Sequence, residues 1–216
     1  GARVVIATPR VIKPGEERIL EHLLRLEPDA VLVRSWAAAA ALAGRGPALH
    51  GDFSLNVTNS VSAGFALGLG LATVTAAHDL DATQLAALLA AAPVGRFAVT
   101  VHHHIPSFHT EHCVYAHLLS GGRDYRSCGR PCEAHQVALR DRTGLVHPVV
   151  VDVGCRNTVF GAQAQSAAGL VKELVAQGVA RLRVEFVREA GADAARVWGA
   201  YRDLAASRTS TASGSR

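Results

Sequence analysis

The sequence contains no methionine among its 216 residues, and it has no long apolar run. The longest such run, 85–94, is well short of the roughly 20 residues that a membrane-spanning helix needs, so we expect no such helix. Residues 1–10 lack the basic segment and apolar stretch of a secretory signal, and we therefore expect a cytoplasmic protein. The missing methionine indicates a removed start residue or a piece of a longer chain.

Lysine and aromatic residues are also scarce. Lys13 and Lys172 are the only lysines, so the positive side of the net charge of +4 is almost all arginine. The flat guanidinium group suits carboxylate and phosphate ligands, although GC-rich coding produces the same excess. Aromatic residues make up 5% of the chain, which provides no evident stacking platform for bases. The composition fits a small anionic or aromatic substrate, or RNA, without choosing between them.

The hydrophobic content of 49% excludes a disordered or fibrous chain. Short β-branched runs alternate with alanine- or leucine-rich amphipathic runs, which is typical of βα units around a parallel sheet. The expected strands are 4–7, 30–33, 49–58, 72–76, 97–101 and 181–187. The expected helices are 14–26, 36–43, 60–69, 81–92, 164–177 and 192–206.

The regular alternation stops between residues 102 and 161, where Gly, Pro, Arg, His and Cys are frequent. Two β-like stretches, 136–139 and 148–153, surround a turn at 141–144 and predict a hairpin. Unstructured loops of this length are rare in compact domains unless they are functional, so we expect an ordered insertion.

These patterns divide the chain into four parts. Residues 1–101 are expected to form the first βα units of a barrel, and 102–161 a Cys/His-rich insertion with a hairpin. Residues 162–206 are expected to form a last βα unit, and 207–216 a disordered tail. A complete eight-unit barrel takes about 250 residues, so about six βα units predict an α/β fold with an incomplete TIM-type (β/α) barrel. Because an open sheet edge invites association, we expect a partner chain, a dimer mate or a missing N-terminal segment to cover it.

All four cysteines and eight of the eleven histidines lie between residues 102 and 155. The cysteines are Cys113, Cys128, Cys132 and Cys155, a CxxxC pair with two distant partners. Zinc ribbons favour two CxxC knuckles, and the sequence has none. Four thiolates from separate loops suit an iron–sulfur cluster. Zinc and unligated thiols remain alternatives on spacing alone.

Three segments around these cysteines resemble the motifs of peptidase family U32, the collagenase-like peptidases. They are FHTEHC at 108–113, CGRPCE at 128–133 and DVGCRN at 152–157, and residues 49–59 resemble a strand motif of the same family. The resemblance extends from residue 4 to about 204 and implies a barrel-like β/α fold. Several members are oxygen-independent hydroxylases of RNA bases or quinone precursors that carry a 4Fe-4S cluster, with prephenate as oxygen source in some.

By this resemblance, Cys113, Cys128 and Cys132 correspond to the central ligand run of the cluster. Cys155 corresponds to a more distant fourth ligand found in part of the family. Many members have another cysteine just after the first, but residues 114–120 contain none. The resemblance therefore requires Cys155 to lie near the other three thiols.

The segment directly before Cys113 contains the candidate catalytic residues His109, Glu111 and His112. A histidine beside a glutamate can act as a general acid and base pair near neutral pH, and the resemblance points to the same segment.

Four further residues are candidates for substrate binding. Arg130 and Arg156 flank the cysteines and could bind an anion or tune the cluster, although structural arginines are the alternative. His50 and Asn56 lie on a strand of the expected barrel and could face the same cavity, although His50 could equally fill the core.

The sequence thus predicts a 4Fe-4S protein of the U32 type that acts in oxygen-independent hydroxylation of an RNA base or a small aromatic or quinone precursor. The alternatives are a peptidase and a zinc-stabilised non-catalytic module. A peptidase needs an activated nucleophile or a metal with an open position, and the sequence has neither a GxSxG nor an HExxH motif. In the module, the cysteines would only staple the insertion.

Overall fold

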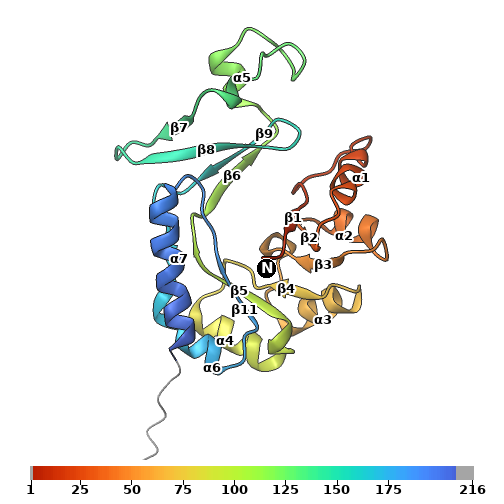
Figure 1. Cartoon of the computed structure of the whole chain (residues 1–216), viewed down its shortest axis with the longest axis vertical. Helices are drawn as coiled ribbons and strands as arrows, with labels where there is room; N and C mark the ends of the chain where they lie inside the picture. Colours follow the sequence, from red (N-terminus) through yellow and green to blue (C-terminus); the bar gives the residue numbers. More distant parts are fainter. Residues whose placement is uncertain (1, 208–216) are drawn as a thin grey trace, which may run out of the picture. The chain divides into compact units, whose positions relative to one another are not determined.

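The computed structural model describes residues 2–207 (Figure 1). Within this range the chain divides into two compact units. Unit 1 comprises residues 2–100, 169–183 and 204–207, and unit 2 comprises 101–168 and 184–203. The expected disordered tail lies, apart from its first residue, outside the described residues.

A strongly curled half-barrel sheet of six strands lies mostly in unit 1. The strands are β1 (Val5–Ala7), β2 (Ala30–Val33), β3 (Ala48–Gly51), β4 (Thr73–Thr75), β5 (Phe97–His103) and β11 (Arg181–Val184). The first five pair in parallel in chain order, and β11 pairs with β5. The fold is therefore mixed α/β, consistent with the predicted incomplete barrel, while the TIM-type topology stays a prediction.

The helices of unit 1 alternate with these strands. They are α1 (Arg18–Arg25), α2 (Trp36–Leu42), α3 (Ser60–Gly68), α4 (Ala82–Ala91) and α6 (Val171–Ala176). Helix α3 begins at a capping box formed by Asn59 and Ser62, and α4 at one formed by Asp81 and Gln84. Each box satisfies backbone N–H groups that the first turn of a helix leaves without an intrahelical partner.

Several predicted elements of this part were wrong in extent, including the helix expected over 14–26, which begins at Arg18, and the strand expected over 181–187, which ends at Val184. Two others differ more. The strand expected over 49–58 ends at Gly51, because a 3-10 turn (Phe53–Leu55) follows and Asn56 takes the left-handed conformation, with φ of 55°. The helix expected over 164–177 starts only at Val171. Its first residues instead form the short strand β10 (Gln165–Ser166), which pairs antiparallel with β5 in unit 2.

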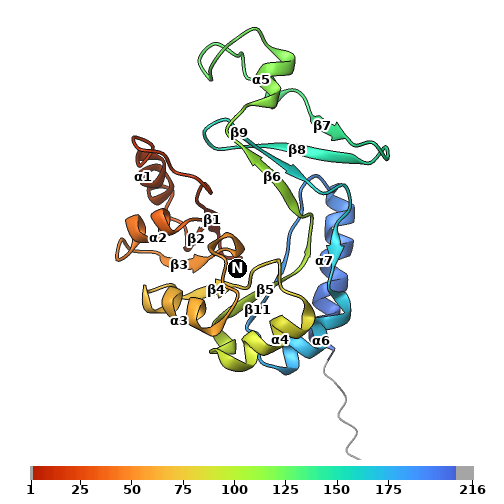
Figure 2. The ribbon, with the colours of Figure 1, turned by 180° about the vertical axis from the view of Figure 1, so that it is seen from behind.

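Unit 2 contains a four-stranded antiparallel sheet (Figure 2). Its order is β6 (Pro106–Thr110), β9 (Arg156–Phe160), β8 (Val146–Asp152) and β7 (Val137–Arg140). Strands β7 and β8 form the predicted hairpin. Strands β6 and β9 were not predicted, because their largely polar sequences lack a clear apolar alternation. The helix α5 (Val114–Leu119) was not predicted either, because its six residues are too few to show a helical period. The long helix α7 (Gly191–Ala206) agrees with the prediction over 192–206.

The core of this sheet is formed by Tyr115, Val149 and Val159, and Cys113 and Cys132 are packed against it. The hydroxyl of Tyr115 donates to the Val149 carbonyl at 2.7 Å.

The guanidinium group of Arg188 completes this arrangement. It donates to the Val137 carbonyl at 3.1 Å, to the Tyr115 hydroxyl at 2.9 Å and to the Val149 carbonyl. One side chain therefore joins α5, β7 and β8.

Among residues 2–207, no helix is both long enough and apolar enough to cross a membrane.

Replacing Arg188 with Met keeps much of the side chain's length but removes these hydrogen bonds. We expect the free energy of unfolding to fall by about 2 kcal/mol, because buried carbonyl groups lose charged donors. Urea denaturation followed by tyrosine fluorescence measures this change. The matched control is Arg196→Met, at an exposed arginine of α7, which should leave the stability unchanged. Equal effects of the two substitutions would contradict the role of Arg188.

Candidate functional site

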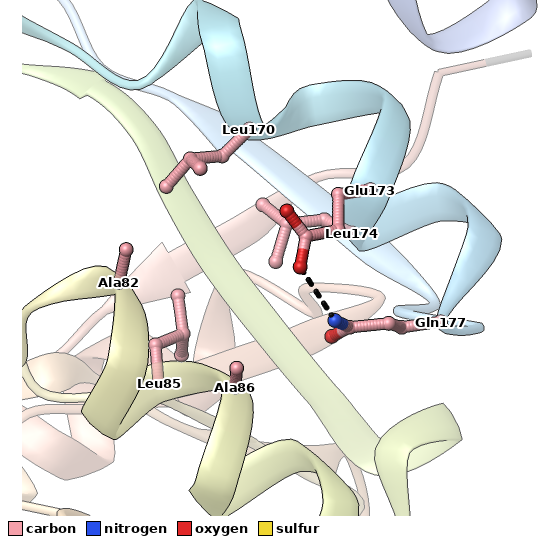
Figure 3. Close-up of a pocket in the computed structure, with 7 residues that line it drawn as sticks. All are labelled: Ala82, Leu85, Ala86, Leu170, Glu173, Leu174 and Gln177. Carbon is pink, nitrogen blue, oxygen red and sulfur yellow. Dashed lines mark hydrogen bonds between the residues drawn. The ribbon is translucent and has the colours of Figure 1, made fainter.

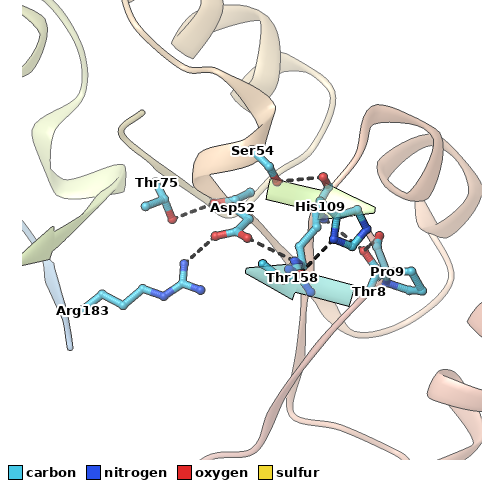
Figure 4. Close-up of polar contacts among 10 residues, drawn as sticks. Thr8, Pro9, Asp52, Ser54, Thr75, His109, Thr158 and Arg183 are labelled. Carbon is cyan, nitrogen blue, oxygen red and sulfur yellow. Dashed lines mark hydrogen bonds and ion pairs between the residues drawn. The ribbon is translucent and has the colours of Figure 1, made fainter. Parts of the chain in front are cut away.

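A buried carboxylate lies at the carboxyl-terminal edge of the half-barrel sheet. Asp52 follows β3 directly and is 2% exposed. Its carboxylate pairs with Arg183 Nη1 at 2.7 Å and with Arg34 Nε at 3.5 Å (Figure 4). Arg34 follows β2, and Arg183 lies in β11. One carboxylate thus holds two arginine side chains from separate strands.

Hydroxyl groups complete the polar contacts at this edge (Figure 4). Thr75 Oγ1 donates to the Gly51 carbonyl at 2.9 Å, and Ser54 Oγ donates to the Arg34 carbonyl at 2.8 Å. Thr8 Oγ1 accepts from the Arg34 N–H at 3.0 Å. Active sites of β/α barrels form at this end of the strands, so the edge is a candidate site in its own right.

An aromatic stack lies on loops that follow strands of the same sheet. His78 stacks on Phe53 with 3.8 Å between ring centroids, and the Arg10 guanidinium lies 4.9 Å from the Phe53 centroid. Neither these residues nor Asp52 were predicted from the sequence. The signal that could have found Asp52 is a lone charged residue within the run 49–58, which was predicted as one strand.

The sequence-predicted residues His50 and Asn56 also lie in unit 1. His50 Nδ1 is 2.7 Å from Thr73 Oγ1 on the next strand, and burial, followed by the charge of Arg181, lowers the pKa of His50. Asn56 is exposed and left-handed, a conformation that asparagine tolerates better than most residues. Their roles in substrate binding stay predictions.

The cysteines lie on three separate segments of unit 2. Cys113 is the N-cap residue of α5, and its Sγ accepts from the Ala116 N–H at 3.5 Å. Cys128 precedes, and Cys132 lies within, a 3-10 turn that packs against α5. Cys155 lies in the tight turn between β8 and β9.

The other three cysteines affect the Cys155 thiol electrostatically. Burial raises the pKa of the Cys155 thiol, and the charges of Cys113, Cys128 and Cys132 raise it further, while Arg130 opposes them. Among residues 2–207, no group of three or more His, Cys, Asp or Glu side chains could hold a metal ion as arranged.

Two of the loops that carry these thiols each contain two consecutive left-handed residues, one loop around Cys128 and Cys132 and the other at Cys155. These are Gly129 and Arg130, with φ of 67° and 52°, and Gly154 and Cys155, with φ of 80° and 61°. A left-handed residue other than glycine costs about 1–2 kcal/mol. Gly154 cannot be larger without displacement, because a Cβ there would lie 2.5 Å from Arg156 Nη1. The loops therefore store strain next to two cysteines.

Glu111 and Arg156 form an ion pair across β6 and β9. Arg156 is 1% exposed, and its Nε donates to Glu111 Oε1 at 2.7 Å. Arg130 lies on the surface, where it pairs with Glu133 at 3.3 Å. The structure thus places Arg156 against a carboxylate of the chain, while the substrate-binding role of both arginines stays a prediction.

The candidate catalytic histidines have other neighbours. His109 Nδ1 is 2.9 Å from Thr158 Oγ1 on β9 (Figure 4), and the His112 ring meets the His117 ring edge-on, with centroids 5.1 Å apart. The sequence predicted that Glu111 pairs with a histidine, whereas in the structure Glu111 forms an ion pair with Arg156.

A comparison with protein families decides the identity. The model described as peptidase family U32 matches residues 10–213, nearly the whole chain. The chain belongs to peptidase family U32. The resemblance that the cysteine motifs indicated is thereby confirmed. Neither a curated protein nor a solved structure matches this U32 chain.

Two clefts in unit 1 of this U32 protein offer little to a substrate. One lies between α4 and α6 and holds about 30 Å³, enough for about one water molecule (Figure 3). A larger hollow of about 450 Å³ between α2 and α3 is lined by apolar side chains, Trp36, Phe65 and Leu69 among them. It lacks the few polar groups that orient a ligand.

The strain at Cys155 predicts a difference between two substitutions that both remove the thiol. After treatment with a chelator, Cys155→Gly should be more stable than Cys155→Ala by about 1 kcal/mol, because glycine adopts a positive φ without a steric penalty. Thermal denaturation of the two variants side by side measures this difference. Equal stabilities would show that the turn relaxes when the thiol is removed.

The lowered pKa of His50 predicts a loss of stability in acid. The unfolded histidine takes up a proton near pH 6.5, whereas the folded one resists it, so stability is lost as the pH falls below about 6.5. His50→Gln should therefore lose less melting temperature than the natural protein between pH 7.5 and 5.5. His22→Gln, at an exposed histidine of α1, is the control. The prediction fails if the His50 variant and the natural protein lose the same amount.

Proposed function

We propose that this U32 protein binds a 4Fe-4S cluster through Cys113, Cys128, Cys132 and Cys155. The observation that carries the proposal is the packing of Cys113 and Cys132 against one small core, with Cys155 in the turn that joins two strands of the same sheet. Four thiolates are the usual ligand set of such clusters, so the donor chemistry of the residues fits the group. When bound, the cluster supplies electron transfer or an iron that acts as a Lewis acid.

The surrounding residues act on the thiols in two ways. Thiols bind iron only when they are deprotonated. Burial and the three other thiols raise the pKa of Cys155 and so oppose that form, whereas the charge of Arg130 favours it. The Tyr115, Val149 and Val159 core packs against Cys113 and Cys132, which shields these two thiols on that side from water.

For the reaction we infer oxygen-independent hydroxylation of an RNA base or a small aromatic or quinone precursor. Family membership and the cysteine motifs support this choice over a structural module. Replacing C–H with C–OH oxidises the substrate by two electrons, so an oxygen donor must take up both. Prephenate is the donor that the family resemblance suggests. His109, Glu111 and His112 are the proposed catalytic residues, because they directly precede Cys113.

A thiol peptidase is the weaker alternative for this family. It would need Cys113 activated by a base within hydrogen-bond reach. Cys113 Sγ instead contacts the Ala116 N–H, and the adjacent His112 faces His117. A zinc-stabilised module would use the same thiols, and metal analysis distinguishes it from an iron–sulfur protein.

The deciding experiment is anaerobic purification and reconstitution of the protein, followed by iron, sulfide and zinc analysis and an ultraviolet–visible spectrum. We expect about four irons and four sulfides per chain with a broad absorbance near about 400 nm. Replacing each cysteine in turn with serine should lower the iron content and the absorbance. Leu118→Ser, at an exposed position of α5, is the matched control and should retain both.

Three outcomes would contradict the proposal. One zinc per chain without iron would favour the module. Full iron content in Cys155→Ser would show that the fourth ligand lies elsewhere. Peptide cleavage by metal-free protein that is lost in Cys113→Ser alone would favour the peptidase.

A further inference from the structure

Cys113 and Cys155 are brought together by the pairing of β6 with β9. In this antiparallel pair, Thr110 lies opposite Asn157. The chain continues from Thr110 to Cys113, and it runs back from Asn157 to Cys155, so both cysteines lie beyond the same end of the pair. The pairing of β6 with β9 does not by itself hold the loops of Cys113 and Cys155 in place, because both loops lie beyond the end of the pair.

The side chain of Asn157 links these two loops. It is 0% exposed, its Oδ1 accepts from the Val114 N–H at 2.7 Å, and its Nδ2 donates to the Cys155 carbonyl at 3.5 Å. Val114 directly follows Cys113. One amide group therefore bonds to the backbone of one cysteine and to the backbone next to the other.

An asparagine is well suited to this position. Its amide has an acceptor and a donor on one short, planar group, whereas aspartate lacks the donor and leucine lacks both. The Val114 N–H belongs to the first turn of α5, where backbone N–H groups have no intrahelical partner. The Cys155 carbonyl belongs to a left-handed residue. Asn157 thus satisfies a helix start and a strained turn together.

We propose that Asn157 is a positioning residue that sets the separation of the Cys113 and Cys155 thiols. That these two thiols are cluster ligands rests on the proposed function; that Asn157 positions them does not. The ion pair between Glu111 and Arg156 joins the same two segments. Loss of Asn157 should therefore loosen the thiols without unfolding the sheet.

The test measures thiol separation in the metal-free full-length chain. In a Cys128→Ser, Cys132→Ser background, a short bifunctional thiol reagent can link only Cys113 and Cys155. Asn157→Leu keeps the number of side-chain heavy atoms and has neither hydrogen bond, and it should cross-link about tenfold more slowly, because cross-linking depends steeply on orientation. Near-ultraviolet circular dichroism confirms that each variant is folded.

The matched control is Tyr201→Phe in the same unit. The buried Tyr201 hydroxyl donates to the Val101 carbonyl at 2.9 Å and is 2.6 Å from Ser166 Oγ, so this variant also loses two hydrogen bonds. It touches neither cysteine segment and should cross-link at the unsubstituted rate. If Asn157→Leu does not fold, Asn157→Asp retains the acceptor for Val114 and should show an intermediate rate.

Cross-linking of a folded Asn157 variant at the rate of the control would overturn the inference. A second readout is the iron content and spectrum of the four-cysteine chain after reconstitution, where Asn157→Leu should lose iron and Tyr201→Phe should not. If the natural chain binds no iron while Asn157→Leu still cross-links slowly, the cluster proposal fails and the positioning role stands. If the natural chain and Asn157→Leu bind equal amounts of iron and have identical spectra, Asn157 does not position the ligands.

Discussion

The burial of Arg156 is the constraint on which the cysteine site depends. A guanidinium group that is 1% exposed cannot lose its hydration without hydrogen-bonded partners, and Glu111 provides one of them at 2.7 Å. Glu111 lies two residues before Cys113, and Arg156 directly follows Cys155. The cost of leaving the buried charge without partners therefore keeps the two cysteine segments side by side.

The left-handed residues follow from this constraint. Cys155 is held between a paired strand and the buried Arg156, so the turn must close within three residues and places Cys155 at a φ of 61°. Strain of this kind persists only where the surroundings over-determine the conformation, and it concentrates at functional sites. The strained loop at Arg130 leads into the turn of Cys132. Strain at both places suggests that thiol placement, and not ease of folding, determined these loops.

The sequence predicted unit 1 better than unit 2 for a physical reason. Its parallel strands are buried and flanked by amphipathic helices, so the apolar pattern reports the fold directly, as in β2 at Ala30–Val33. Strands β6 and β9 carry His109 and Thr158, whose side chains contact each other across the sheet, and no local pattern reveals such pairing. The motifs found the cysteines, but they could not show that Arg156 and Asn157 face the segment around Cys113. The role of Asp52 was missed because its partners come from distant strands.

The scarcity of lysine has a structural counterpart. Arg188 donates to three groups on three elements, and Arg156 reaches both a carboxylate and the Val153 carbonyl. A lysine ammonium is a single compact donor centre and cannot span such sets, whereas the planar guanidinium fork can. Coding bias or anion binding would each account for many arginines in the sequence. The contacts of Arg188 and Arg156 show that arginine also does structural work here, since each joins segments that the sheet alone would leave unconnected.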